Sequence, residues 1–261
     1  MPVIQGLGWT FDTVAKTYEK LRPGYPDPLY EAIFAHQPMN EKKSALEVGI
    51  GGGQATEPVL KTGCSVLAVE PGENFCALCR DKFKAYSFFS ALNGKFEEAE
   101  LSEKQYDLVY SASAFHWVPE EAGYKKVYDV LKNGGSFARF ANHPYYDKRH
   151  PGMFEAVQEV YAVYMPGSLV PDEYSDEQAR KRAEIALKYG FTDIQHHLFH
   201  RTRDFTAAEY IQLLGTYSDH IAIEKETRGK FFAEIEQAIN RMGGVITIFD
   251  TIDLQLARKP E

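Results

Sequence analysis

Short apolar runs alternate with segments of helical character between residues 44 and 141. The apolar runs predict strands, and the intervening segments carry apolar residues at 3-4 spacing or end in glycine, as helices do. Alternating strands and helices favour a parallel, doubly wound α/β sheet. The expected strands are Ala45–Val48, Ser65–Val69, Ser87–Leu92, Tyr106–Ser111 and Ser136–Ala141, and the expected helices are Glu57–Lys61, Phe75–Lys84 and 119–131.

The pattern changes at Asn142, where an aromatic and basic stretch without clear periodicity begins. Two capping boxes, Ser175 with Gln178 and Thr206 with Glu209, predict helix starts further on. Two later strands are expected at 194–200 and 245–257. We expect one folding unit, with a core sheet from 40–141, 191–201 and 244–258. A helical cap is expected from 1–36, 142–190 and 203–242.

Composition limits the classes of partner. The chain of 261 residues has 29 Lys and Arg against 37 Asp and Glu, a formal net charge of -8, without blocks of like charge. This argues against nucleic acid or an anionic membrane as the main partner. No signal peptide and no apolar run of about 18 residues is visible. With only three cysteines, we expect a soluble, cytoplasmic protein, either a monomer or a homodimer.

A glycine-rich stretch after the first strand is the main candidate binding site. Glu47 precedes glycines at alternate positions, Gly49, Gly51 and Gly53, where bare backbone can approach a ligand. The dinucleotide pattern G-x-G-x-x-G/A fails here, because Gln54 and Thr56 occupy the last place in its two registers. A carboxylate beside the loop suits a ligand with an ammonium or sulfonium charge. An NAD-dependent oxidoreductase is therefore the disfavoured alternative.

Two further strand ends carry chemistry that suits a nucleoside. Glu70, at the end of the second strand, is placed to accept both hydroxyls of a ribose, although turns with Pro and Gly also recruit acidic residues. Phe96 and Glu97, after the third strand, suit an adenine ring, with Glu98 as a neighbouring alternative.

The stretch Glu47-x-Gly49-x-Gly51-x-Gly53 resembles the first motif of class I S-adenosylmethionine-dependent methyltransferases. The wider pattern resembles their small-molecule group, which includes trans-aconitate methyltransferase. The resemblance implies a Rossmann-like, mostly parallel seven-stranded sheet with an antiparallel last strand. It also implies S-adenosyl-L-methionine as cofactor, S-adenosyl-L-homocysteine as product, and a small-molecule methyl acceptor. The cofactor-binding residues implied are Tyr18, Arg22, Glu47, Gly49, Gly51, Gly53, Gln54, Glu70, Pro71, Phe96, Glu97, Ser111 and Ala112.

Tyr18 and Arg22 belong to a Tyr-x-x-x-Arg-Pro-x-Tyr-Pro pattern ahead of the first strand. From the residues alone, this segment could close over a ligand or cover a sheet edge. The resemblance favours the first interpretation.

Candidate substrate residues follow the fourth and fifth strands. Phe115, His116 and Trp117 follow the fourth strand, which faces the first across the site of a doubly wound sheet. His116 is the candidate general base, although a packed wall residue is the commoner role for such a histidine. Substrate contacts are also expected from His143, Tyr145, Tyr146 and Arg149, or these side chains simply pack the cap.

We expect no metal site. Cys76-x-x-Cys79 lacks the second pair that zinc would need, and strand alternation puts His196 and His197 on opposite faces.

In-line methyl transfer needs no nucleophile on the protein. A regulator that binds the cofactor without transferring methyl is the remaining alternative.

Overall fold

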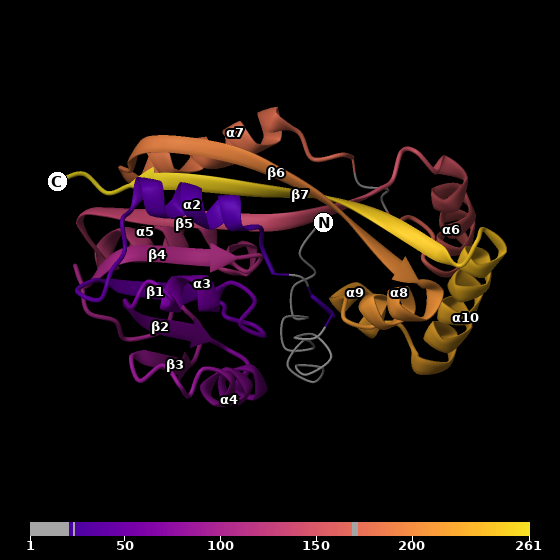
Figure 1. The fold of residues 1–261 in the computed structure, drawn as a ribbon, viewed down its shortest axis with the longest axis horizontal. Helices are drawn as coiled ribbons and strands as arrows, with labels where there is room; N and C mark the ends of the chain where they lie inside the picture. The colour runs from indigo at the N-terminus through magenta and orange to yellow at the C-terminus, as the bar shows by residue number, and fades with distance from the viewer. Residues whose placement is uncertain (1–20, 23, 169–171) are drawn as a thin grey trace. The chain divides into compact units, whose positions relative to one another are not determined.

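The computed structural model describes residues 21–22, 24–168 and 172–261. Its seven strands form one sheet in the order β3-β2-β1-β4-β5-β7-β6 (Figure 1). The strands are β1 (Ser44–Val48), β2 (Ser65–Glu70), β3 (Phe89–Asn93), β4 (Tyr106–Ala112), β5 (Leu131–Tyr146), β6 (Thr192–Thr206) and β7 (Val245–Arg258).

The sheet is parallel from β3 through β5. Leu46 of β1 lies beside Leu67 of β2 and Val109 of β4, and β5 pairs with β4 in the same direction. β7 runs antiparallel to its neighbours (Figure 1). The predicted fold class, a mostly parallel Rossmann-like sheet with an antiparallel last strand, is confirmed.

Helices connect the strands. None of the described helices is long and apolar enough to cross a membrane. The α-helices are α2 (Asp27–His36), α3 (Thr56–Leu60), α4 (Glu73–Lys82), α5 (Glu120–Val130), α6 (Pro151–Tyr164), α7 (Asp176–Glu184), α8 (Ala207–Leu214), α9 (Ser218–Ile221) and α10 (Lys225–Arg241). The described residues also include two 3₁₀ helices, η2 (Phe115–Trp117) and η3 (Ile185–Tyr189).

The chain divides into two compact units. Unit 1 contains the described residues 21, 143–168, 172–173 and 200–251, and unit 2 contains 22, 24–142, 174–199 and 252–261. The strands β5, β6 and β7 each contribute residues to both units. Each unit has an apolar core of its own.

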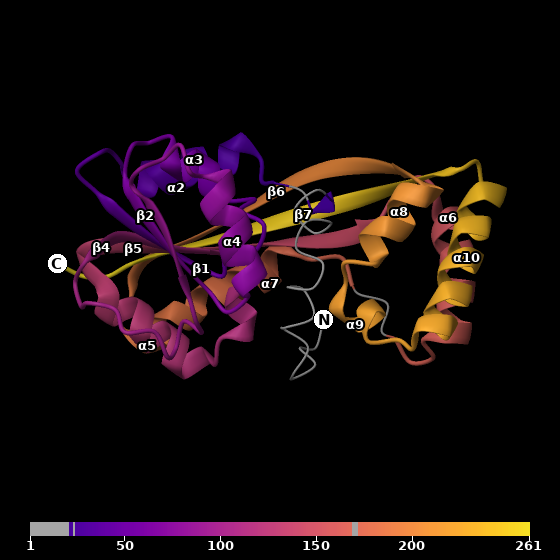
Figure 2. The ribbon, with the colours of Figure 1, turned by 90° about the horizontal axis from the view of Figure 1, so that it is seen from below.

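In unit 2, apolar residues cover both faces of the sheet. Ala45 and Leu108 belong to the cluster on one face, with residues of α2 and α3, while Leu46 and Val109 belong to the cluster on the other, with residues of α5. Figure 2 shows α2 and α3 on one side of the strands and α5 on the other. The alternation follows from the period of two along a strand.

In unit 1, α10 packs against α6 and α8. Their shared core includes Val157, Leu214, Phe231 and Ile235, all of them almost fully buried. Apolar residues at 3-4 spacing on α10 produce this face, as the amphipathic pattern requires.

Strand lengths are where the sequence prediction was wrong. β5 continues to Tyr146 instead of ending at Ala141, and β6 continues to Thr206. His143, Tyr145 and Tyr146 therefore lie on a strand and not in a loop. Their aromatic side chains suit extended backbone, which the neighbouring prolines and histidines obscured. Both predicted capping boxes are confirmed.

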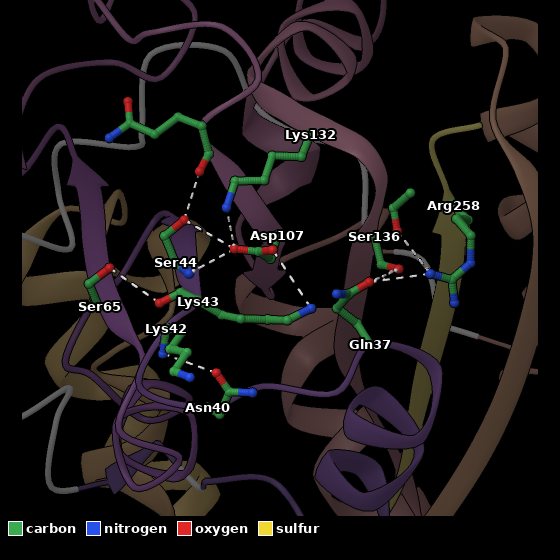
Figure 3. A network of polar contacts seen from close by, with 12 residues as sticks. Gln37, Asn40, Lys42, Lys43, Ser44, Ser65, Asp107, Lys132, Ser136 and Arg258 are labelled. Carbon is green, nitrogen blue, oxygen red and sulfur yellow. Dashed lines mark hydrogen bonds and ion pairs between the residues drawn. The ribbon is translucent and has the colours of Figure 1, made fainter. Parts of the chain in front are cut away.

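A polar network ties the first residue of β1 to β4 at their amino ends (Figure 3). Asp107 Oδ2 accepts from the amide N–H of Ser44 at 3.0 Å and from Lys132 Nζ at 2.8 Å, and Lys43 lies 3.7 Å from Oδ1. Burial acts to raise the pKa of Asp107, but these donors and cations hold it below its usual value. The network fixes the register of the two strands that flank the glycine loop.

A second group of contacts in Figure 3 joins Gln37, the residue after α2, to β5 and β7. The Gln37 side-chain oxygen accepts from Ser136 Oγ at 3.0 Å and from Arg258 Nη1 at 3.3 Å. Arg258 Nη1 also donates to the carbonyl of Gly134 at 2.9 Å. These bonds satisfy buried polar groups and hold β7 against the parallel part of the sheet.

Candidate functional site

The carboxyl ends of the parallel strands β1 to β4 meet at one edge of the sheet. Val48 of β1 pairs with Val69 of β2, and Glu70 pairs with Asn93 of β3. Ser111 of β4 is fully buried, and its hydroxyl donates to the carbonyl of Val48 at 2.8 Å. Ligands of doubly wound sheets bind at this edge, where strand order reverses between β1 and β4.

The loop after β1 has left-handed backbone at all three alternate glycines. Gly49, Gly51 and Gly53 have φ of 75°, 51° and 72°. The amide of Gly49 donates to the Val69 carbonyl, and that of Gly53 to the Ile50 carbonyl, both at 2.9 Å. The loop is therefore a hydrogen-bonded turn with little side-chain bulk.

Two of these glycines also lack room for a side chain. A Cβ on Gly49 would lie 2.4 Å from the Cβ of Ala114, and a Cβ on Gly53 would lie 2.6 Å from the Phe83 ring. Both distances are too short for real contacts. The loop accordingly presents bare backbone, which suits close approach of a ligand.

Glu70 joins this loop to the turn after β2. Its Oε2 accepts from the amide N–H of Gly51 at 3.1 Å, and its Oε1 accepts from that of Gly72 at 2.9 Å. The residue is only 7% exposed. A carboxylate has about four acceptor positions, so these two bonds are compatible with ribose hydroxyls.

Glu47 lies beneath the loop, fully buried. Its Oε2 accepts from Thr56 Oγ1 and from the Tyr110 hydroxyl, each at 2.8 Å, while Oε1 has no partner among the described residues. Burial raises the pKa of Glu47 to about 8, against the effect of the two hydroxyl donors. The side chain therefore lies in the interior beneath the loop, held by the two hydroxyl groups.

Gln54 and Pro71 flank the two loops. The Gln54 side-chain nitrogen is buried and has no hydrogen-bond partner within the described ranges. Pro71 is exposed, and its carbonyl accepts from Asn93 Nδ2 at 3.0 Å. Asn93 Nδ2 also donates to the Glu70 carbonyl at 3.1 Å. This asparagine, which ties the ends of β2 and β3 together, was not singled out from the sequence.

Phe96 and Glu97 lie after β3, at different depths. Phe96 is 3% exposed and belongs to the core on the α5 face, with Lys126 Nζ 5.5 Å from its ring centroid. Glu97 is half-buried, and its carbonyl accepts from Lys126 Nζ at 3.1 Å. Little of the Phe96 ring surface is open to a ligand.

The segment after β4 combines core and surface residues. Phe115 is 3% exposed and packs edge-on against Tyr124, with ring centroids 5.3 Å apart. His116 is exposed and Trp117 half-buried, and their ring centroids are 5.2 Å apart. Ala112, half-buried, pairs with Phe140 of β5. The imidazole of His116 thus lies at the surface of unit 2 and Phe115 in its core.

Ser113, next to the predicted site residue Ala112, was not singled out from the sequence. It is one of three described non-glycine residues with positive φ, at 53°. Its hydroxyl lies 2.9 Å from the Tyr25 hydroxyl and accepts from the amide of Asn142 at 3.3 Å. Left-handed backbone at a serine indicates local strain of the kind that concentrates at functional sites, and no local sequence signal announces it.

The remaining predicted residues divide between the N-terminal segment and unit 1. Tyr18 lies outside the described residues, and Arg22 is half-buried. In unit 1, the Tyr146 ring stacks on Phe154 at 4.1 Å and lies 4.4 Å from the Tyr145 ring.

Arg149 and His143 are the last two candidates, also in unit 1. His143 is half-buried on β5. Arg149 Nε donates to Asp147 Oδ1 at 2.9 Å, and this bond lowers the pKa of the Asp147 carboxyl, although burial opposes the shift. The guanidinium therefore already has a carboxylate partner.

Comparison with known proteins agrees with the fold and the loop. A family model described as a methyltransferase domain matches residues 46–138. An uncharacterized methyltransferase of Schizosaccharomyces pombe is 26% identical over 234 residues, 89% of this chain and 88% of that protein.

Two solved structures share the fold. A protein from Anaeromyxobacter dehalogenans, assigned as a type II methyltransferase, has a TM-score of 0.66 at 20% identity, covering 92% of this chain and 99% of that one. Phosphoethanolamine N-methyltransferase 2 of Haemonchus contortus, in complex with S-adenosyl-L-methionine, has a TM-score of 0.56 at 17% identity, covering 100% of this chain and 61% of that one. The matched domain spans the strands and loops of the site. Residues 46–138 therefore match a methyltransferase domain, and the chain resembles methyltransferases in sequence and in fold.

Proposed function

We propose that this methyltransferase binds S-adenosyl-L-methionine at the carboxyl ends of β1 and β2 and transfers its methyl group to a small-molecule acceptor. The observation that carries the proposal is the bond from the Gly51 amide to Glu70 Oε2, at 3.1 Å. It places an acidic side chain directly against a loop of bare backbone. This combination suits a ligand with a ribose and a charged, flexible tail.

The residues fit that cofactor. Glu70 would accept from the ribose hydroxyls, and the glycine loop has no side chains that would occupy the space beside it. Gln54 brings a buried side-chain nitrogen without a partner among the described residues, a donor that a bound carboxylate would satisfy. Ser111 and Ala112 would border the site from β4.

The chemistry is a displacement at the sulfonium methyl group that the cofactor supplies. When bound, the cofactor would supply a methyl group to an oxygen, nitrogen or carbon of the acceptor, and the electron pair of the carbon–sulfur bond would leave on sulfur. The protein contributes alignment and exclusion of water. His116 is the candidate to receive the acceptor's proton, because its exposed imidazole lies on η2, the short helix that follows β4.

A small-molecule acceptor, as in the group that includes trans-aconitate methyltransferase, is supported by the charge. A net charge of -8 disfavours nucleic acid as acceptor. Phe115 and Trp117 of unit 2, which lie in the short helix after β4, are the proposed wall of the acceptor site. The three cysteines are free thiols, which accords with a cytoplasmic location.

The test is transfer of a labelled methyl group from S-adenosyl-L-methionine into separate fractions of small metabolites, protein and nucleic acid. We expect label in the metabolite fraction, with release of S-adenosyl-L-homocysteine, and less label with the Glu70→Ala variant at the same cofactor concentration. Label confined to protein or nucleic acid would contradict the small-molecule assignment.

A further inference from the structure

One face of α4 lies against both loops of the proposed cofactor site. The thiol of Cys79 donates to the carbonyl of Gly51, with Sγ 3.2 Å from the oxygen. One turn earlier, the thiol of Cys76 donates to the carbonyl of Glu70 at 3.5 Å. Residues three apart share a helix face, so a single face of α4 contacts both strand ends.

The contact with the glycine loop is close. Cys79 Sγ lies 3.3 Å from where a Cβ on Gly53 would be, and the Phe83 ring is closer still at 2.6 Å. Lys82 Nζ donates to the Gly52 carbonyl at 3.0 Å. Because the glycines contribute no side chains, groups from outside the loop must hold its shape. α4 supplies two of them, Cys79 and Lys82, and Phe83 directly after the helix supplies a third.

The bond from Cys79 determines which way one loop amide points. In a trans peptide the C=O and the N–H that follows it point to opposite sides. With the Gly51 carbonyl held toward α4, the Gly52 N–H points away from α4. Among the described residues, no acceptor takes a hydrogen bond from this amide. Gly52 N–H is thus a donor presented by the loop.

The Cys79 thiol is suited to a permanent donor role. The side chain is fully buried. Burial is the main cause that raises the pKa of the thiol, and the nearby Glu47 raises it further. The thiol therefore stays protonated at neutral pH. Burial likewise raises the pKa of Cys76 to about 11.

We propose that Cys79 is a positioning residue for the cofactor: its S–H bond to the Gly51 carbonyl fixes the Gly51–Gly52 peptide so that the Gly52 amide is aimed at the ligand. The inference rests on the proposed cofactor site. It assigns a role to a side chain that touches neither the cofactor nor the acceptor. Cys76 supports the neighbouring turn in the same way.

The test compares S-adenosyl-L-methionine affinity and thermal unfolding in matched variants. Cys79→Ala removes the donor, and Cys79→Ser restores one. Cys64→Ala is the control, because Cys64 is also a fully buried thiol of unit 2 and donates to the carbonyl of Val59 at 3.6 Å, in a different segment. If Cys79→Ala does not fold, Cys79→Val replaces it, since valine fills the space without donating.

We expect similar losses of melting temperature in Cys79→Ala and Cys64→Ala. The dissociation constant should rise about three- to tenfold in Cys79→Ala only, the range expected for one modest hydrogen bond. Cys79→Ser should return it to within about twofold of wild type. Equal affinities in the two alanine variants, or no rescue by serine, would overturn the positioning role. Failure of the wild-type protein to bind S-adenosyl-L-methionine would overturn the proposed function as well.

Discussion

Glu70 and Gly51 are joined by a hydrogen bond from the loop amide to the carboxylate, 3.1 Å long, across the ends of two neighbouring strands. The bond makes the acidic side chain part of the loop's support as well as a candidate ligand for ribose. Removing the carboxylate should therefore affect the site in two ways, through lost contact with the cofactor and through a looser loop.

Glu70→Ala should weaken binding of S-adenosyl-L-methionine by about 1–3 kcal/mol, the usual cost of leaving hydrogen-bonding groups unpaired. Calorimetric titration measures the change. The control is Glu73→Ala, because Glu73 is an exposed residue of the same segment, paired with Arg80 at 3.2 Å. Affinity unchanged in Glu70→Ala would mean that Glu70 does not hold the ribose.

Gly49→Ala should destabilise the protein by about 2 kcal/mol or more, because alanine is strained at a φ of 75° and its Cβ would meet Ala114 at 2.4 Å. Thermal and denaturant unfolding measure this. Adding Ala114→Gly should recover part of the lost stability, because it removes the contact with the new Cβ. The recovery should be incomplete, because the backbone strain at residue 49 remains.

The control for this prediction is Gly229→Ala on α10, where a Cβ would meet nothing within 4 Å. Alanine is the better helix former, so this variant should be as stable as wild type or slightly more so. A Gly49→Ala protein with wild-type stability would contradict the geometry of the loop.

Glu47 should make stability fall as pH rises. Its pKa is about 8 in the folded protein, above the ordinary value of about 4.3. Between these values the folded protein keeps a proton that the unfolded chain has lost, so the free energy of unfolding declines, by at most about 1.4 kcal/mol per pH unit. Glu47→Gln, which cannot ionise, should remove this contribution.

The measurement is the difference in unfolding free energy between wild type and Glu47→Gln from pH 5 to pH 8. We expect that difference to shift in favour of the glutamine variant as pH increases. Parallel pH profiles would show that Glu47 ionises normally and that its burial is not as described.

His116→Ala should lower turnover less than tenfold if the imidazole only lines the site. A loss of about a hundredfold or more would instead identify a general base. Steady-state kinetics with an identified acceptor separates the two outcomes. His196→Ala is the control for removing an imidazole from unit 2, because His196 bonds Asp176 at 3.0 Å and has no assigned part in the site.

Most of the fold could be predicted from sequence because it depends on local patterns. The alternation of apolar runs and helices gave the parallel sheet, and the capping boxes at Ser175 and Thr206 were read correctly. The extension of β5 to Tyr146 was not predicted, because His143 and Pro144 resemble a loop. The strand that pairs with β5 and keeps these residues extended is far away in the sequence.

The glycines of the site could be predicted from the sequence, but the side chains that hold the loop in place could not. Alternate glycines signal left-handed backbone directly. That Glu47 is buried depends on Thr56 and Tyr110, which only the fold brings to it. The bond from Cys79 to Gly51 likewise joins residues 28 positions apart. Sequence spacing identifies the loop and says nothing about what holds it.

Calorimetric titration of the wild-type protein with S-adenosyl-L-methionine, S-adenosyl-L-homocysteine and NAD, in parallel, tests the central claim most directly. It examines the glycine loop before any acceptor is known. We predict micromolar binding of the first two and no binding of NAD. Binding of NAD alone would contradict the cofactor assignment and would indicate an oxidoreductase site in its place.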